Sequence, residues 1–119
     1  MELFTSKFVI WNPARPEVTE ELEALVDTGA SYSWLHRSRL ERLQVQPAGR
    51  MQFRTIEGHM IERQVAAVFV RYDGRIGGDT VVIAEPTDEE VLGAHTMESL
   101  GLAADPVQKK LVPTVGMAV

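Results

Sequence analysis

The chain has no cysteine among its 119 residues, which excludes disulfide bonds and thiolate-ligated metals and leaves the redox compartment undetermined. Basic residues are also scarce, because 12 lysines and arginines stand against 17 aspartates and glutamates, for a net charge of -5. This balance offers no basic stripe that could neutralise phosphates, so we expect no nucleic-acid partner. No apolar run approaches the roughly 18 residues that a membrane span requires, so we also expect no membrane partner.

Two further features are missing. Residues 1–8 lack the basic start and apolar core of a signal peptide, and the sequence therefore predicts a cytoplasmic protein. The three histidines, His36, His59 and His95, are scattered without the spacing of metal ligands. Since zinc sites need several convergent ligands, we expect neither a metal ion nor a cofactor.

What the chain does contain is a series of strand signals, and its length suits a single domain over residues 1–119. Apolar, β-branched and aromatic runs alternate with turn residues, which predicts a mostly β domain with one or two short helices. The expected strands cover residues 3–11, 20–26, 32–35, 51–55, 60–72, 80–84 and 110–115, and the expected helices cover residues 37–43 and 94–100.

One of these segments is ambiguous. Residues 20–26 alone would suit a helix, but the alternation of Leu22, Ala24 and Val26 favours a strand with those side chains on one face. Gly29 follows closely and supports a strand that ends in a tight turn. We therefore expect a strand here.

The sequence predicts which residues of the two short helices face the core and which face solvent. Leu40 and Leu43 share one face of the first helix, and we expect Arg37, Arg39 and Arg42 to form its solvated face rather than an anion site. In the second helix, Met97 and Leu100 are at helical spacing and are expected in the core, as is Trp34. Gly101 is a natural C′ residue for that helix.

The most informative stretch is residues 25–31, Leu-Val-Asp-Thr-Gly-Ala-Ser, in which a carboxylate directly follows an apolar strand end. Such a carboxylate is costly unless hydrogen bonds or a partner charge stabilise it. Gly29 lets the backbone fold tightly around Asp27 because it has no Cβ. Taken alone, Asp27 is better explained as a turn aspartate that caps its own backbone.

Two distant features accompany this turn. Glu57-Gly58 lies between two strand-like runs and is a hairpin signal, since glycine accepts a positive φ. Val91-Leu92-Gly93 is an apolar-apolar-glycine segment that leads into the second expected helix.

With these three features in this order, nearly the whole chain resembles a retropepsin-like (retroviral-type, single-domain) aspartic protease subunit. The resemblance implies an acid-protease β-barrel subunit in which the hairpin is a mobile flap and the apolar-apolar-glycine strand passes beneath the aspartate loop. It assigns the following roles: Asp27 is catalytic, Thr28 and Gly29 complete the active-site loop, Ala30, Ile56, Glu57, Gly58 and His59 bind substrate, and Leu92 and Gly93 support the loop.

The resemblance also implies a second copy of the chain. Water-activating aspartates of this family work in pairs, and this sequence carries one such turn, so the partner carboxylate must come from another subunit. The expected function is that of a homodimeric aspartic endopeptidase that hydrolyses peptide bonds of a polypeptide substrate. Thr28 of each subunit would reach the opposite loop, and residues 110–115 could supply part of the interface. The alternative is a catalytically inactive module for dimerisation or peptide binding.

The sequence departs from the viral pattern at two places. Ser31 stands where the viral enzymes usually carry an acidic residue, and Ala94 and His95 stand where they carry a basic one. The salt bridge that helps to hold the viral dimers together is therefore not expected here, and the predicted dimer would rest on other contacts.

Overall fold

Two long antiparallel strands begin the fold in the computed structural model, which describes residues 3–116 and 118. Strand β1 (Phe4–Trp11) pairs with β2 (Thr19–Val26) along its whole length, from Phe4↔Val26 to Trp11↔Thr19. The turn between them contains Pro13 and Pro16, which cannot continue a strand ladder. The remaining elements are β3 (Trp34–His36), α1 (Arg37–Arg42), β4 (Gly49–Arg54), β5 (Met60–Tyr72), β6 (Arg75–Ala84), β7 (Val91–Leu92), α2 (Ala94–Ser99), β8 (Leu102–Asp105) and β9 (Lys110–Pro113).

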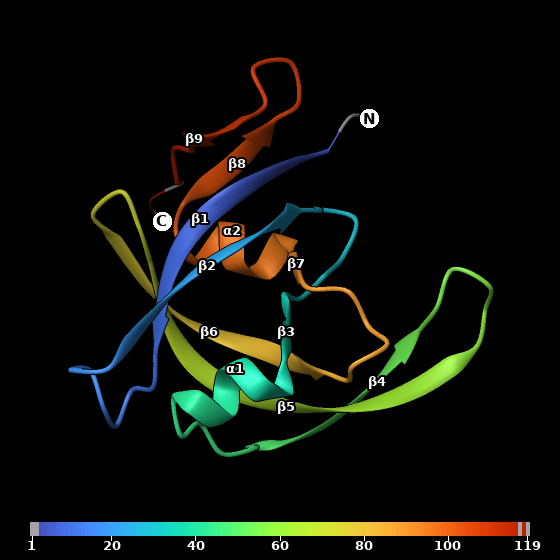
Figure 1. The fold of residues 1–119 in the computed structure, drawn as a ribbon. Helices are drawn as coiled ribbons and strands as arrows, with labels where there is room; N and C mark the ends of the chain where they lie inside the picture. The colour runs from blue at the N-terminus through green and yellow to red at the C-terminus, as the bar shows by residue number, and fades with distance from the viewer. Residues whose placement is uncertain (1–2, 117, 119) are drawn as a thin grey trace.

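The strands form one large curved sheet (Figure 1). Its seven strands follow the order β1-β2-β7-β3-β6-β5-β4, and β1 also pairs with β5, so that the sheet folds back on itself. Strands β8 and β9 form a separate two-stranded sheet. The prediction of a mostly β fold with two short helices is confirmed.

The core explains why the ambiguous segment is a strand. Leu22, Ala24 and Val26 are all buried, whereas the intervening glutamates at positions 21 and 23 are exposed. This two-residue period places Leu22, Ala24 and Val26 on the core face, which a helix could not do. Met97 and Leu100 are also buried, as the sequence predicted.

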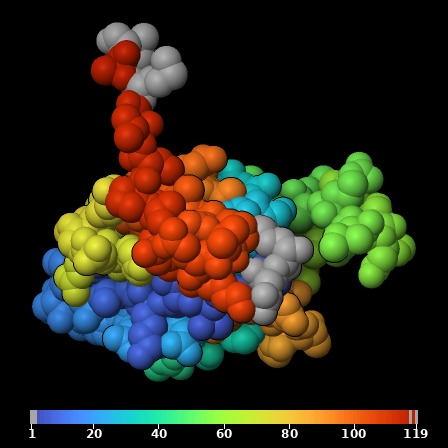
Figure 2. All heavy atoms as spheres, turned by 90° about the horizontal axis from the view of Figure 1, so that it is seen from above, coloured from blue at the N-terminus to red at the C-terminus, as the bar shows by residue number. Residues whose placement is uncertain are grey.

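Two expectations about local structure are wrong. The last strand ends at Pro113 instead of Val115, whose side chain is fully exposed, and Figure 2 shows the chain projecting from the body after this strand. Strand β6 begins at Arg75 instead of at the expected residue 80, so Gly77 and Gly78 lie inside the strand. Strand β8 was not predicted.

Candidate active site

The loop of Asp27 begins where β2 runs beside β7. The two strands are parallel, with Leu25 opposite Val91 and Val26 opposite Leu92. The backbone N–H of Asp27 continues this ladder by donating to the Leu92 carbonyl oxygen at 2.9 Å. The position of Asp27 is therefore set by a buried strand pair, which holds a functional group more firmly than a free loop does.

The carboxylate of Asp27 is half-buried and is held by its own turn. The Gly29 N–H donates to Oδ1 at 3.0 Å, and the Ala30 N–H donates to the Asp27 carbonyl oxygen at 3.1 Å. A Cβ at position 29 would lie only 3.1 Å from Oδ1, so glycine is the residue that suits this turn. These bonds are those of a capping turn aspartate, but they engage only one carboxylate oxygen. No described residue donates a hydrogen bond to Oδ2.

Gly93 lies directly beneath the loop. A Cβ there would meet the Ala30 carbonyl oxygen at 2.8 Å, which no real side chain tolerates. The two residues after Gly93 then hold the loop from below: the Ala94 N–H donates to the Ala30 carbonyl oxygen and the His95 N–H to the Ser31 carbonyl oxygen, both at 2.8 Å. The structure thus brings the aspartate loop and the apolar-apolar-glycine segment, residues 91–93, together.

A cleft of about 630 Å³ separates this loop from the β4–β5 hairpin. Among the lining residues, all of which the structure describes, Asp27 is the one acid. Of the residues with an expected substrate role, Ala30 and Ile56 line the cleft, whereas Glu57, Gly58 and His59 do not. Gly29 lines it as well, and Thr28 is exposed outside it.

The hairpin itself has the form expected of a flap. Strands β4 and β5 pair from Gly49↔Val65 to Arg54↔Met60, and Gly58 in the turn has a φ of 90°. This positive φ confirms the hairpin prediction. The hairpin extends away from the body of the sheet (Figures 1 and 2), and Ile56 at its tip is fully exposed.

An aromatic wall of the cleft was not predicted. Trp34, expected in the core, is only half-buried and lines the cleft together with Tyr32 and Phe53. Their rings are in contact, with centroids 5.2 Å apart for Trp34 and Phe53 and 6.2 Å apart for Tyr32 and Phe53. Trp34 is displaced from the core because β3 presents Leu35, not Trp34, to the interior. In a strand, Trp34 and Leu35 must point to opposite faces, and this alternation was the signal in residues 32–35 that could have placed Trp34 outside the core.

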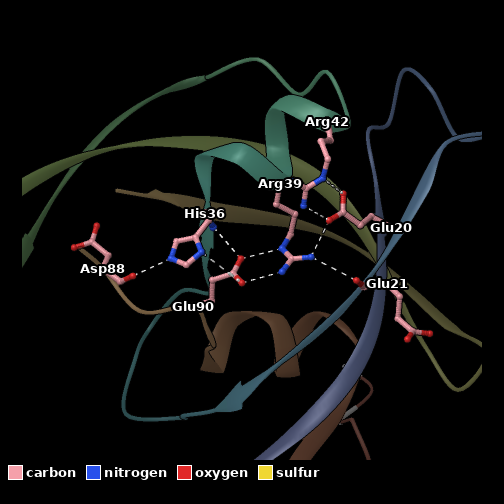
Figure 3. A network of polar contacts seen from close by, with 7 residues as sticks. All are labelled: Glu20, Glu21, His36, Arg39, Arg42, Asp88 and Glu90. Carbon is pink, nitrogen blue, oxygen red and sulfur yellow. Dashed lines mark hydrogen bonds and ion pairs between the residues drawn. The ribbon is translucent and has the colours of Figure 1, made fainter. Parts of the chain in front are cut away.

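Hydrogen bonds and ion pairs hold the segment that leads into β7 against α1 and β3 (Figure 3). Glu90 accepts two bonds from the Arg39 guanidinium, both at 2.9 Å, and one from the His36 N–H at 2.9 Å. Burial acts to raise the pKa of Glu90, but the bonds from Arg39 and His36 outweigh it, and the net shift of that pKa is downward. Arg39 is only 17% exposed, so its assignment to a solvated face is wrong.

The neighbouring arginines of α1 are ion-paired as well. Arg42 contacts Glu20 at 2.6 Å and Arg37 contacts Glu85 at 2.6 Å. All three arginines of this cluster therefore pair with acidic residues of neighbouring elements.

A second hollow, of about 930 Å³, lies on another part of the molecule, between the β1–β2 turn and the segment around α1. It does not include the Asp27 loop. Among the described residues there is no cluster of three or more potential metal-ligating side chains, and no helix among them could span a membrane.

Comparisons with known proteins agree with this geometry. A family model described as aspartyl protease matches residues 18–96, from the start of β2 into α2. The EIAV protease complexed with the inhibitor HBY-793 is 21% identical, with a TM-score of 0.61 over 84% of this chain and 89% of that chain. The Simian Foamy Virus (mac) protease is 20% identical, with a TM-score of 0.51 over 78% of this chain and 92% of that chain.

No curated protein sequence matches the chain. The structural likenesses confirm the predicted retropepsin-like fold, and the family match covers more than half of the sequence. The chain belongs to the aspartyl protease family.

Proposed function

We propose that this protein is a homodimeric aspartic endopeptidase in which Asp27 of each subunit supplies one of two catalytic carboxylates. The observation that supports it most is the setting of Asp27: a carboxylate fixed by β7 and its own turn, alone among acids in the cleft, with one oxygen not engaged by any described residue. A single carboxylate lacks the acid partner that this chemistry needs, and a second copy of the same loop would provide it.

Two carboxylates at close range cannot both ionise readily, so the pair shares one proton. The ionised member takes a proton from a water molecule held between them, and that water attacks the scissile carbonyl carbon. The protonated member donates its proton to the carbonyl oxygen, which yields a neutral tetrahedral diol. Collapse of the diol breaks the C–N bond as the leaving nitrogen accepts a proton, and no covalent enzyme intermediate forms.

The substrate would bind as an extended polypeptide. Strand β4 is an edge strand of the large sheet and lines the cleft, so a peptide strand could pair with exposed backbone groups there. Tyr32, Trp34 and Phe53 give the adjacent wall an apolar surface that favours apolar substrate side chains. Ile56 would cover the peptide from the hairpin tip.

Cleavage of unfolded casein between mildly acid and neutral pH tests the activity. Wild-type protein should cleave casein, and the Asp27→Asn variant, which keeps the size of the side chain, should not. Absence of wild-type cleavage, or equal cleavage by the variant, would leave the alternative of an inactive dimerisation or peptide-binding module.

Sedimentation of the same protein, with and without a peptide substrate, tests the assembly. We expect a dimer in at least the substrate-bound sample. A stable monomer in both samples at micromolar concentration would contradict a two-subunit site.

A further inference from the structure

A buried carboxylate outside the cleft is connected to the Asp27 loop. Asp79 is on β6, and its side chain is fully inaccessible to solvent. Both of its oxygens accept hydrogen bonds from α2: Oδ1 from His95 Nδ1 at 2.7 Å, and Oδ2 from the Thr96 hydroxyl at 2.5 Å.

The connection continues through two hydroxyl groups. Thr96 is hydrogen-bonded to the Ser33 hydroxyl, and the Ser33 Oγ accepts the N–H of Gly93 at 2.9 Å. Thr96 and Ser33 are themselves buried. Since a hydroxyl has one proton to donate, the arrangement that satisfies every donor runs in one direction: Gly93 N–H to Ser33, Ser33 to Thr96, and Thr96 to Asp79.

An ionised Asp79 fits this direction. An ionised carboxylate only accepts, and here it accepts at both oxygens. A protonated Asp79 would carry a donor toward Thr96 or His95. Donation toward Thr96 would reverse the hydroxyl chain and leave the buried Ser33 proton without an acceptor, and a buried unpaired polar group is costly. Donation toward His95 would keep the direction of the chain but leave Thr96 with a neutral acceptor, and a hydrogen bond to a neutral acceptor is weaker than one to a carboxylate.

The same short segment that closes this chain also supports the Asp27 loop. The N–H of Gly93 binds Ser33, while the N–H groups of Ala94 and His95 bind the carbonyl oxygens of Ala30 and Ser31. A shift of residues 93–95 is therefore transmitted to the loop through two backbone hydrogen bonds.

The electrostatic setting of Asp79 shifts its titration upward from that of a free carboxyl group. Burial raises the pKa of Asp79, while the bonds from Thr96 and His95 oppose that shift without cancelling it. Because the folded-state pKa is raised, the folded protein takes up this proton at a higher pH than the unfolded chain does. Asp79 is then ionised above its folded pKa and protonated below it.

Other charged groups around α2 are engaged elsewhere or exposed. Arg75 of β6 donates to a carbonyl oxygen at the end of α2 at 3.0 Å, and Asp105 of β8 accepts N–H groups of the following turn. Glu98, on α2 itself, is exposed, and the Tyr32 ring lies 5.2 Å from the His95 ring. His95 is thus the titratable side chain that contacts Asp79.

We propose that Asp79 and His95 are positioning residues that hold the Asp27 loop in its working conformation while Asp79 is ionised, and that protonation of Asp79 loosens the loop. The inference deepens the proposed function, because it concerns regulation of the same site by pH. Neither residue touches the substrate; both act through Ser33, Thr96 and Gly93.

Nuclear magnetic resonance tests this coupling without any activity. In an Asp27→Asn background the catalytic carboxylate no longer titrates, so a pH-dependent change in the loop must come from another group. We expect the amide signals of Gly93 and Ala30 to shift with the same midpoint as the carboxyl carbon of Asp79. Amide signals that stay constant while Asp79 titrates would overturn the proposal, and this measurement needs no variant at position 79.

Variants sharpen the test. Asp79→Asn keeps the size of the side chain and can still accept from Thr96, but it removes the titration. The pH-dependent shift should therefore vanish. Asp105→Asn is the matched control, since Asp105 caps a turn away from the loop, and the shift should persist. Persistence of the shift in Asp79→Asn would overturn the coupling.

Kinetics supply an independent readout. Below the folded pKa of Asp79 its ionised fraction falls about tenfold per pH unit, so the acid limb of log kcat should be steeper by about one unit of slope in wild type than in Asp79→Asn, with KM little changed. Equal slopes would contradict the positioning role. If wild type cleaves nothing, the proposed function fails, while the spectroscopic test of the coupling still stands.

Discussion

Substitution of Gly93 by alanine probes the junction between the fold and the candidate site. The added Cβ would collide with the Tyr32 carbonyl group and would lie 2.8 Å from the Ala30 carbonyl oxygen, and both groups belong to the backbone of the segment that follows Asp27. The loop must move to relieve this contact, and the hydrogen bonds that Ala94 and His95 donate to it, both 2.8 Å long, must lengthen.

The expected cost follows from these contacts. Overpacking costs about 1–3 kcal/mol, and each of the two weakened backbone hydrogen bonds costs about 1 kcal/mol, so we expect the free energy of unfolding to fall by about 3–5 kcal/mol. For a domain of this size, that loss lowers Tm by roughly 10–20 °C. Since the loop carries Asp27, casein cleavage should also fall in protein that is still folded.

Gly49→Ala is the matched control. Its Cβ would meet a Val65 methyl carbon at 3.9 Å, an ordinary van der Waals contact, and Gly49 does not have a positive φ. Both substitutions reduce the entropy of the unfolded chain similarly, so their difference isolates the close approach at Gly93. Urea unfolding followed by tryptophan fluorescence measures this difference. Free energies of unfolding within about 1 kcal/mol of each other would refute the reasoning.

Two further predictions concern the ion-paired brace and the hairpin tip. Glu90→Gln should lower the free energy of unfolding at neutral pH by about 1–3 kcal/mol, because Arg39 loses one of its two charged partners in a largely buried site and keeps only Glu20. The pKa of Glu90 is lowered in the folded state, so the extra stability of wild type is present above the unfolded pKa and is lost as pH falls through the folded pKa. Urea titrations over this pH range should show the free energies of unfolding of the two proteins converging, and a constant difference between them would contradict the prediction. Ile56→Ala should raise KM for casein several-fold and leave the urea midpoint unchanged, since the side chain is fully exposed in the free protein; a lowered midpoint with unchanged KM would show a structural role instead.

Local patterns were sufficient for most of the strands. The two-residue period of Leu22, Ala24 and Val26 identifies β2, and the glycine at position 58 identifies the hairpin, because each depends on neighbouring residues in the sequence. The approach of Leu92 to Asp27 was available only through the family resemblance, because nothing local in either segment specifies a pairing across 65 residues.

Other features depend on tertiary context. Strand β8 has two alanines and an aspartate, which carry little β-propensity, and it forms because β9 pairs with it. Gly77 and Gly78 suggest a turn in isolation, but pairing with β5 extends β6 through them. The sequence also did not predict the partial burial of Arg39 or the complete burial of Asp79, because their partners, Glu90 and His95, are distant in the sequence.

Mixing of subunits tests the central claim most directly. Wild-type and Asp27→Asn proteins are combined in different proportions at constant total concentration, allowed to exchange subunits, and assayed for casein cleavage. If each active site needs one Asp27 from each of two subunits, activity follows the square of the wild-type fraction, and an equal mixture retains about a quarter of the wild-type rate. Activity that falls in direct proportion to the wild-type fraction, to about half in the equal mixture, would contradict a shared site.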